Sequence, residues 1–371
     1  MSFRYAAGFN KPGLNTLVAP VSSGVYLYTW GVNSSGQLGL GNITSYSSPM
    51  QVGSLTTWLN VAGGGYHLIA TKSDGTLWTS GRNDVGQLGL GNTTYYSSPK
   101  QVGALTTWSK ISGGGNHTTA VKTDGTMWTW GWNTFGQLGD GTSVNKSSPV
   151  QIGALTNWSN VTAGYGYTIA VKTDGTLWTW GQNTYGQMGI GTLVNRSSPV
   201  QVGSLTTWLN IAGCYASTFA VKTDGTLWSW GKNTDGNLGL GNRTTYSSPK
   251  QVGALTNWSN LTGGDSFVMA TKTDGTLWSW GQNIQGQLGL GNVTYYSSPK
   301  QVGSLTTWLN IASGYNHAIA RKTDGTLWTW GWNNDGQLGL GNRTRYSSPK
   351  QVGTLTNWLN IAGGGTFTIT A

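Results

Sequence analysis

The chain has 371 residues, with 59 Gly, 21 Trp and only 9% charged residues, and its acids are all Asp. Strong helix formers are scarce, whereas Trp, Tyr, Thr and Val favour strands and Gly favours turns, so the composition predicts almost no helix. The formal net charge of +10 reflects a shortage of acids, and we expect a solvated basic surface without a nucleic-acid partner and without membrane insertion.

The first segment, residues 1–20, is predicted to be an N-terminal arm. Its Pro and Gly residues and scattered apolar side chains suit docking into a larger assembly. It has no uninterrupted apolar core of signal-peptide length. Residues 21–371 are predicted to form one domain, in which the single Cys214 cannot make an internal disulfide.

A unit of 50 residues repeats along this domain. A Gly recurs at that spacing from Gly31 to Gly331, and a Trp precedes it in every copy except the one with Ser80. Two further aromatic series with the same spacing begin at Tyr28 and Trp58. The three series contain 19 of the 21 tryptophans. They predict repeated sheets that pack large aromatic side chains against their neighbours.

Each unit can be divided into four short strands. In the copy that begins at Trp58, we expect strands at 58–62, 67–72, 75–80 and 99–102, with a hairpin turn at Asp74-Gly75 and a loose glycine turn at 63–65. Equivalent blades are expected from about 58, 108, 158, 208, 258 and 308.

The two ends of the repeat region supply complementary halves of one unit. Residues 24–30 match the third strand and residues 358–370 match the first two. We therefore predict an all-β fold, a seven-bladed β-propeller of four-stranded blades, with the ring closed by a composite blade of 358–371 and 21–53. Closure removes open sheet edges, and for this reason we favour it over an open solenoid.

The repeat resembles a known family in two segments of the unit. Residues 174–181 read Asp-Gly-Thr-Leu-Trp-Thr-Trp-Gly, and residues 183–191 read Asn-Thr-Tyr-Gly-Gln-Met-Gly-Ile-Gly. The pattern resembles the regulator of chromosome condensation family, which implies a seven-bladed propeller closed by two strands from each terminus. The founding member exchanges nucleotide on a small GTPase and binds nucleosomes. Its exchange activity depends on a hairpin inserted into one blade, which the uniform period of this chain lacks.

Catalytic chemistry finds no support in the sequence. Six of the 11 Asp residues are hairpin residues equivalent to Asp74, and the other five fall in separate loops. His67, His117 and His317 lie in different repeats, where we expect a structural role. No acid–base pair or metal-ligand set results, so we predict no enzyme, no catalytic residue, no metal and no cofactor.

Differences between the copies concentrate in two connections, those after the first and third strands. In an up-and-down blade these connections lie at the same end of the strands, so the variation is expected on one face of the ring. Aromatic and Arg side chains there are typical of recognition surfaces. The candidate binding residues are Trp132, Trp332, Tyr95, Tyr96, Tyr295, Tyr296, Arg82, Arg343 and Arg345.

Three functions remain open for this face. The first, which we favour, is an exposed virion component, such as a phage decoration or fibre protein, or another surface component. The second is an intracellular adaptor, exchange factor or chromatin binder of the classical family, which would be cytoplasmic if cellular. The third is a lectin-like module, in which Trp132, Trp332 and the paired tyrosines stack on the sugar rings of a surface polysaccharide. A protein partner, or a larger assembly reached through the arm, is expected in the first two.

Overall fold

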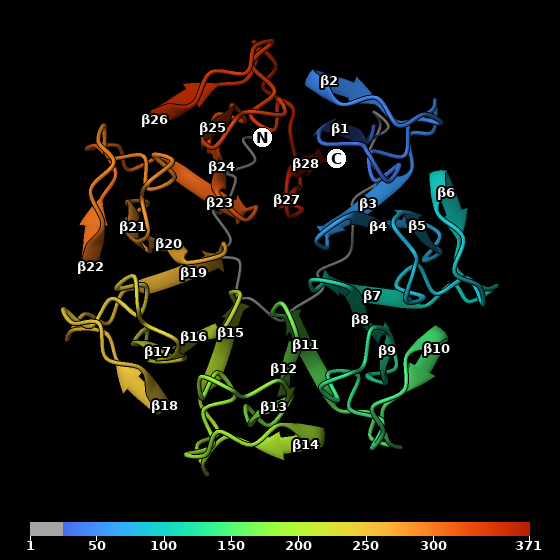
Figure 1. The fold of residues 1–371 in the computed structure, drawn as a ribbon. Coiled ribbons are helices and arrows are strands. Elements are labelled where there is room, and N and C mark those ends of the chain that lie inside the picture. Colours follow the sequence, from blue (N-terminus) through green and yellow to red (C-terminus); the bar gives the residue numbers. More distant parts are fainter. Residues whose placement is uncertain (1–24) are drawn as a thin grey trace, which may run out of the picture.

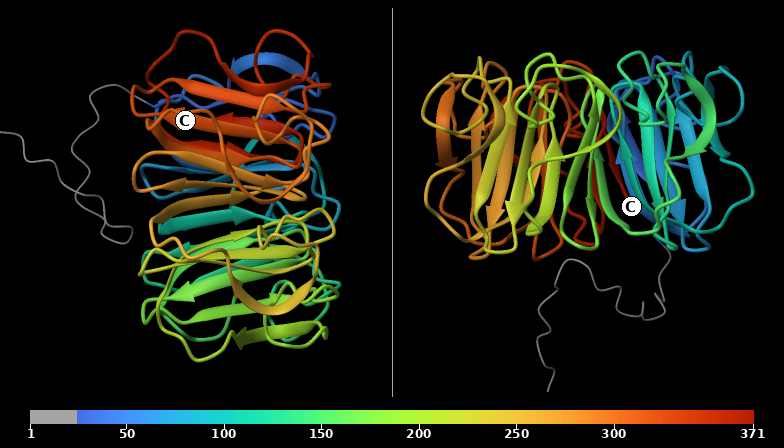
Figure 2. Two further views of the ribbon diagram at one scale, coloured as in Figure 1. Left: turned by 90° about the vertical axis from the view of Figure 1, so that its left-hand side faces the viewer. Right: turned by 90° about the horizontal axis from the view of Figure 1, so that it is seen from below.

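The computed structural model describes residues 25–371, so the predicted arm at 1–20 and residues 21–24 lie outside the described residues. Seven four-stranded antiparallel sheets surround a central axis (Figure 1). Seen edge-on, the ring is a disc whose strands run between its two ends (Figure 2). The predicted all-β seven-bladed propeller is confirmed. Within 25–371 there is no helix long and apolar enough to cross a membrane.

The strands of each blade follow one another from the axis to the rim. The innermost strands are β3 (Trp58–Gly63), β7 (Trp108–Gly113), β11 (Trp158–Ala163), β15 (Trp208–Gly213), β19 (Trp258–Gly263), β23 (Trp308–Ser313) and β27 (Ile361–Gly363). The second strands are β4 (His67–Lys72), β8 (His117–Lys122), β12 (Tyr167–Lys172), β16 (Ser217–Lys222), β20 (Phe267–Lys272), β24 (His317–Lys322) and β28 (Phe367–Thr370).

The outer half of each blade contains the other two strands. The third strands are β5 (Leu77–Gly81), β9 (Met127–Gly131), β13 (Leu177–Gly181), β17 (Leu227–Gly231), β21 (Leu277–Gly281), β25 (Leu327–Gly331) and β1 (Tyr28–Gly31). The rim strands are β6 (Tyr96–Gln101), β10 (Lys146–Gln151), β14 (Arg196–Gln201), β18 (Tyr246–Gln251), β22 (Tyr296–Gln301), β26 (Tyr346–Gln351) and β2 (Tyr46–Gln51).

The ring closes through a composite blade, as predicted. Its strand order is β2-β1-β28-β27, and β28 pairs with β1 in a register that places Thr368 opposite Trp30. Figure 1 shows β28 beside β1, although the two strands come from opposite ends of the sequence.

The rim strand is longer than predicted, because a bulge accommodates two serines. Gly81 pairs with Tyr96, whereas Thr79 pairs with Lys100, so the register shifts between the two pairs. The prediction that this strand begins at Pro99 is therefore wrong. Pro99 itself lies on an edge strand, where a missing N–H costs no ladder bond.

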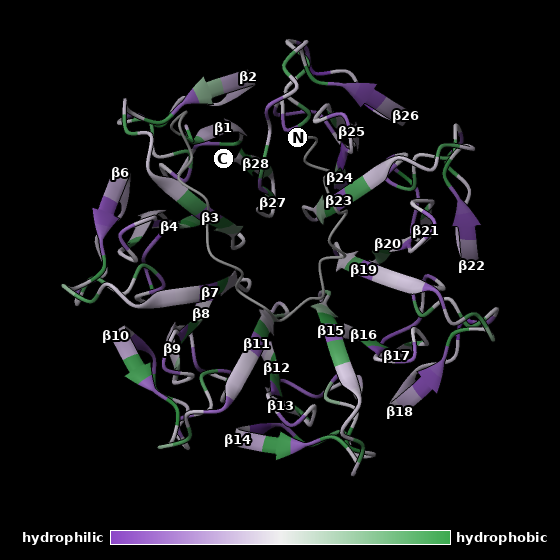
Figure 3. Cartoon of the chain, turned by 180° about the vertical axis from the view of Figure 1, so that it is seen from behind, coloured by the Kyte–Doolittle hydropathy of each residue, from purple (hydrophilic) through white to green (hydrophobic). Residues whose placement is uncertain are grey.

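The rim strands are protected against pairing with other chains. Figure 3 shows β6, β18, β22 and β26 as hydrophilic, and each contains Ser, Pro and Lys. In β6 this lysine is Lys100. The equivalent residues in the other three rim strands, β2, β10 and β14, are Met50, Val150 and Val200. Charged residues and Pro on an edge strand discourage edge-to-edge association.

The tryptophans form the core between blades. Trp130 is fully buried and packs edge-to-face on Trp108, with 5.8 Å between ring centroids, in a cluster with Ile69 and Leu77 of the preceding blade. Its indole N–H donates to the backbone carbonyl of Gln87 at 3.0 Å. The tilted geometry and the satisfied N–H are the arrangement that buried Trp favours. Each blade therefore buries this aromatic face only because the preceding blade covers it.

Candidate functional site

The two ends of the disc are built from different connections. At one end, Arg82 N donates to Tyr66 O at 2.9 Å, joining the long loop after the third strand to the turn after the innermost strand. At the other end, Ser73 N donates to Thr57 O at 2.8 Å, joining the hairpin after the second strand to the segment between blades. We call the first end the loop face. Its two kinds of connection are called the inner turns (64–66 and equivalents) and the long loops (82–95 and equivalents).

The opposite end repeats one turn with almost no change. Thr76 donates its N–H at 2.9 Å and its hydroxyl at 2.6 Å to Asp74 Oδ1. These hydrogen bonds lower the pKa of the exposed Asp74 carboxyl. The same Asp–Thr contact recurs at the five equivalent hairpins. The sequence differences between the connections of the blades are accordingly concentrated on the loop face.

Each long loop is held by one buried Asn. Asn83 Oδ1 accepts from Leu88 N at 2.9 Å, and its Nδ2 donates to Asn92 O at 2.9 Å and to Thr94 O at 3.0 Å. Asn occupies the equivalent position in all seven long loops. The variable side chains therefore project from loops with a fixed backbone.

Three predicted Arg and Trp residues make contacts within a long loop or with the inner turn beside it. The guanidinium carbon of Arg82 lies 5.9 Å from the Tyr66 ring centroid, and Arg82 Nε donates to Asp84 Oδ1 at 3.0 Å. Two other predicted residues meet directly, because the Arg345 guanidinium carbon lies 4.3 Å from the Trp332 ring centroid.

Trp132 connects a long loop to the axis. Its ring packs edge-on against Phe135 of the same loop at 5.1 Å and against Tyr165 at 6.1 Å. Since Tyr165 belongs to the inner turn of the next blade, Trp132 forms part of an aromatic surface that crosses a blade boundary.

The predicted tyrosine pairs are divided between loop and strand. Tyr95 is exposed and Tyr295 half-buried, at the ends of their loops, whereas Tyr96 and Tyr296 are the first residues of β6 and β22. Tyr96 accepts from Asn92 Nδ2 at 3.4 Å, and Lys100 Nζ lies 5.4 Å from its ring. Tyr296 makes the same two kinds of contact. The prediction that Tyr96 and Tyr296 lie in the variable loops is therefore wrong, because both residues belong to rim strands.

Arg343 is exposed, and within 25–371 it makes no hydrogen bond or ion pair. The nine candidates thus share one face but do not form one cluster. Their role in binding stays a prediction.

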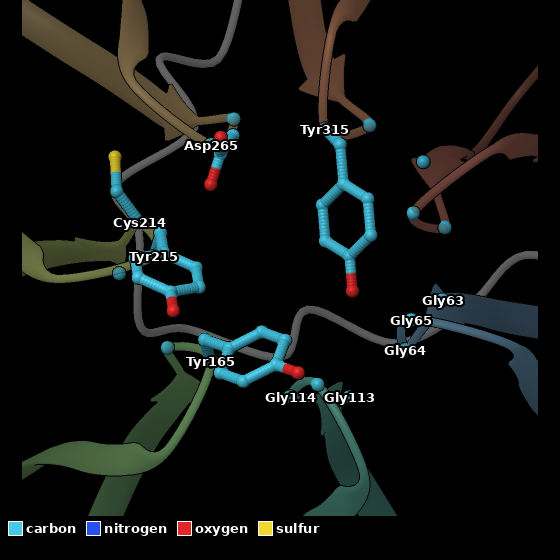
Figure 4. A pocket seen from close by; sticks show the side chains of 18 of the residues that line it. Gly63, Gly64, Gly65, Gly113, Gly114, Tyr165, Cys214, Tyr215, Asp265 and Tyr315 are labelled. Carbon is cyan, nitrogen blue, oxygen red and sulfur yellow. The ribbon is translucent and has the colours of Figure 1, made fainter. Parts of the chain in front are cut away.

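A pocket that was not predicted from the sequence lies on the axis of this face. The middle residues of the seven inner turns converge there (Figure 4): Gly65, Gly115, Tyr165, Tyr215, Asp265, Tyr315 and Gly365. They line an open pocket with a cavity volume of about 90 Å³. A signal was present in the repeats, because this position changes between Gly, Tyr and Asp while the residue before it is Gly in six of the seven copies.

Backbone hydrogen bonds between inner turns hold the mouth of the pocket. Gly365 N donates to Gly64 O at 3.0 Å, Gly115 N to Tyr165 O at 3.1 Å, and Tyr315 N to Gly365 O at 2.8 Å. A turn is thereby tied to the turn of the next blade, which fixes the directions of the side chains that enter the pocket.

The glycines of the inner turns make room for side chains. A Cβ at Gly114 would lie 2.2 Å from His117 Cε1, and the other turns with a ring at the equivalent of His117 also have Gly. In the one remaining turn, Cys214 stands where the ring is replaced by Ser217. Close approach, rather than the loose turn that we predicted, therefore requires these glycines.

The pocket contains one carboxylate and little counter-charge. Burial raises the pKa of Asp265, and the charge of Lys232 partly opposes this. Lys232 Nζ lies 5.6 Å from the Tyr185 ring and 6.0 Å from the Tyr215 ring, and it makes no ion pair with Asp265. Burial also raises the pKa of Tyr315. Both groups thus lie in a partly desolvated site.

No group of three or more His, Cys or acidic residues within 25–371 could hold a metal. The three histidines are fully buried, and burial lowers the pKa of each to about 3. They are neutral packing residues near neutral pH, in agreement with the structural role expected from the sequence.

These features define the class of protein as a seven-bladed β-propeller closed through its termini, with one constant and one variable end. The regulator of chromosome condensation (RCC1) repeat model matches the chain seven times. The matched residues are 26–71, 74–121, 124–171, 174–221, 224–271, 274–321 and 324–371. A second model of the same repeat matches residues 108–137, 158–187 and 308–337. The chain belongs to the RCC1 repeat family.

Solved structures of low sequence identity share the fold. Human WBSCR16 superposes with a TM-score of 0.84 at 20% identity, covering 94% of this chain and 98% of that one. Prp20p from Saccharomyces cerevisiae, described with its binding to Gsp1p and histones, gives a TM-score of 0.80 at 20% identity, covering 94% and 92%. Yeast RCC1 (Prp20) bound to Kap60 gives 0.83 at 19% identity, covering 100% and 94%. A search of curated proteins found no match.

Proposed function

We propose that the protein is a non-catalytic scaffold that binds a protein partner through the loop face. The observation that carries this proposal is the difference between the two ends of the disc. The connections vary most at one end, where Trp132, Trp332 and Arg345 project from loops with a fixed backbone. Rigid aromatic and Arg side chains supply much of the energy of protein recognition at a small entropic cost.

The structural relatives support a protein partner rather than a small substrate. The yeast propellers are described with Gsp1p, with histones and with Kap60. At about 20% identity these likenesses establish the fold.

A proteome-derived peptide display selection on the purified chain tests the proposal. A variant with Trp132→Ala, Trp332→Ala and Arg345→Ala should bind the selected sequences at least about tenfold more weakly, since each anchor contributes on the order of 1–2 kcal/mol. The matched control is Leu155→Ser, an exposed residue in a segment between blades at the opposite end. Equal binding by the triple variant, or a loss confined to the control, would overturn the proposal.

Nucleotide exchange is the second candidate, favoured by family membership. Across 25–371 the strands recur in all blades without an inserted hairpin. Measured nucleotide release from a small GTPase decides the matter, and acceleration by catalytic amounts of the chain would establish exchange. The virion and polysaccharide hypotheses draw no support from the comparisons, and both stay predictions.

A further inference from the structure

Three aromatic rings surround the axial pocket. Tyr165, Tyr215 and Tyr315 come from three blades, and Figure 4 shows their side chains around a common space into which Asp265 also points. The rings of Tyr165 and Tyr215 lie 4.8 Å apart with an interplanar angle of 37°. One side of the space is therefore a continuous aromatic wall.

Glycines on the other turns position these rings. A Cβ at Gly365 would lie 2.5 Å from Tyr315 Cε2, and one at Gly115 would lie 2.7 Å from Tyr165 Cδ2. Tyr315 reaches across the axis, because its hydroxyl oxygen would lie 2.6 Å from a Cβ at Gly65. The combination of Gly and Tyr at equivalent positions thus leaves one narrow space of about 90 Å³ beside the rings.

The carboxylate in this space has no partner of its own. Within 25–371, Asp265 accepts no side-chain or backbone hydrogen bond through its carboxylate and forms no ion pair. The nearby ammonium group of Lys232 lies instead near the rings of Tyr185 and Tyr215. An aromatic wall facing an unpaired carboxylate attracts a cation, since the ring faces carry partial negative charge.

Resting on the proposed function, we infer that the axial pocket binds an alkylammonium group, namely a lysine side chain of the partner in its free or methylated form. The anionic side chains of an acidic partner would meet Asp265 and the tyrosine ring faces, which disfavour negative charge. The net charge of +10 opposes a cationic partner at long range, so the attraction here depends on short-range contact with the rings.

Ligand-observed saturation-transfer NMR on the full chain tests the inference. The probes are Nα-acetyl-lysine amide and its Nε-trimethyl form, with the neutral Nε-acetyl form and Nα-acetyl-glutamate amide as controls. We expect transfer to the two ammonium probes, reduced about tenfold in apparent affinity by Asp265→Asn or Tyr215→Ala. Ile284→Ala, an exposed residue in a long loop outside the pocket, should have no effect. Unchanged melting curves would show that each variant folds.

Binding of the neutral probe as strong as that of the ammonium probes, or ammonium binding unchanged in Asp265→Asn, would overturn the inference. A second experiment separates it from the proposed function. Selected partner sequences are resynthesised with each Lys replaced by Gln. If their binding still needs Trp332 and Arg345 but no Lys, the pocket inference fails and the proposed function stands. If the ammonium probes bind while no partner depends on the loop face, the proposed function fails and the pocket is a site for free amines.

Discussion

The junctions between neighbouring blades are of two kinds, although their backbones are alike. At four of them a ring hydrogen-bonds to the next blade: His67 to Thr118, His117 to Thr168, Tyr167 to Thr218 and His317 to Thr368. At the other three the equivalent residues are Ser217 and Val268, Phe267 and Ala318, and Phe367 and Leu68. A ring that can hydrogen-bond always faces a Thr, and a Phe always faces an apolar residue.

The polar junctions assign the histidine tautomer. Thr118 Oγ1 donates its hydrogen to Gln87 O at 2.8 Å, so it must accept from His67 Nε2 at 2.9 Å. Because burial lowers the pKa of His67 to about 3, the ring is neutral near neutral pH and its one proton is on Nε2. The comparison shows that one frame tolerates either chemistry, provided that both partners change together, because an unmatched buried polar atom is costly.

The largest expected effect is a decrease in the free energy of unfolding in acid, caused by the buried histidines of the polar junctions. Burial holds the pKa of His67, His117 and His317 at about 3 in the folded chain, against an ordinary value of 6.5. The unfolded chain therefore takes up protons first as the pH falls below 6.5. Below pH 6.5 each histidine should lower the free energy of unfolding by up to ~1.4 kcal/mol per pH unit. The three together should lower it by up to about 4 kcal/mol per pH unit.

Urea unfolding at pH 7.0 and at about pH 5 measures this loss, in a range above the ordinary pKa of carboxyl groups. The matched variant replaces all three histidines with Tyr, the residue at position 167, and should keep most of its stability at pH 5. An equal loss in the two proteins would show that the histidines are not responsible.

The next largest effect is expected for Trp130→Ser. This substitution places Ser, the residue at the equivalent position 80, at the polar junction of His67 and Thr118. Because Trp130 is fully buried, we expect a loss of about 4 kcal/mol in the free energy of unfolding. The chain tolerates Ser80 next to a cluster that includes Leu68 and Phe367. Adding His67→Phe and Thr118→Leu to Trp130→Ser copies that junction and should recover part of the lost free energy of unfolding. No recovery would contradict the conclusion that the two partners of a junction must change together.

The smallest effect is expected for Thr118→Leu alone. It leaves His67 Nε2 buried without a partner, at a cost of about 1–3 kcal/mol. In the double variant with His67→Phe, the cost should fall by at least about 1 kcal/mol, because the pair then resembles Phe367 and Leu68. A double-mutant cycle by chemical unfolding measures this coupling, and strictly additive costs would contradict it.

The architecture was predictable because the repeat is regular. The 50-residue spacing and the Trp series define the blades, and the complementary ends of the repeat region define the closure, as the pairing of β1 with β28 shows. The start of the rim strand was not predictable from local pattern. Ser97 and Ser98 have no strong strand preference, and the bulge that includes them depends on pairing with Gly81 across the sheet.

The site was predictable only in part. The end of the disc that varies follows from the order of the connections, and Trp332 and Arg345 do meet there. The axial pocket was missed because Tyr165, Tyr215, Tyr315 and Asp265 are separated by 50 or more residues. Only closure of the ring brings them together, and single turns read in isolation look like ordinary glycine turns.

The pairing of β1 with β28 also governs how the molecule comes apart. In an open array, a terminal repeat has one neighbour and can fray at the cost of one interface. In the closed ring every blade has two neighbours, so releasing any blade breaks two tryptophan-filled interfaces at once. Without an end from which unfolding could spread, the seven units should lose their structure in one cooperative transition.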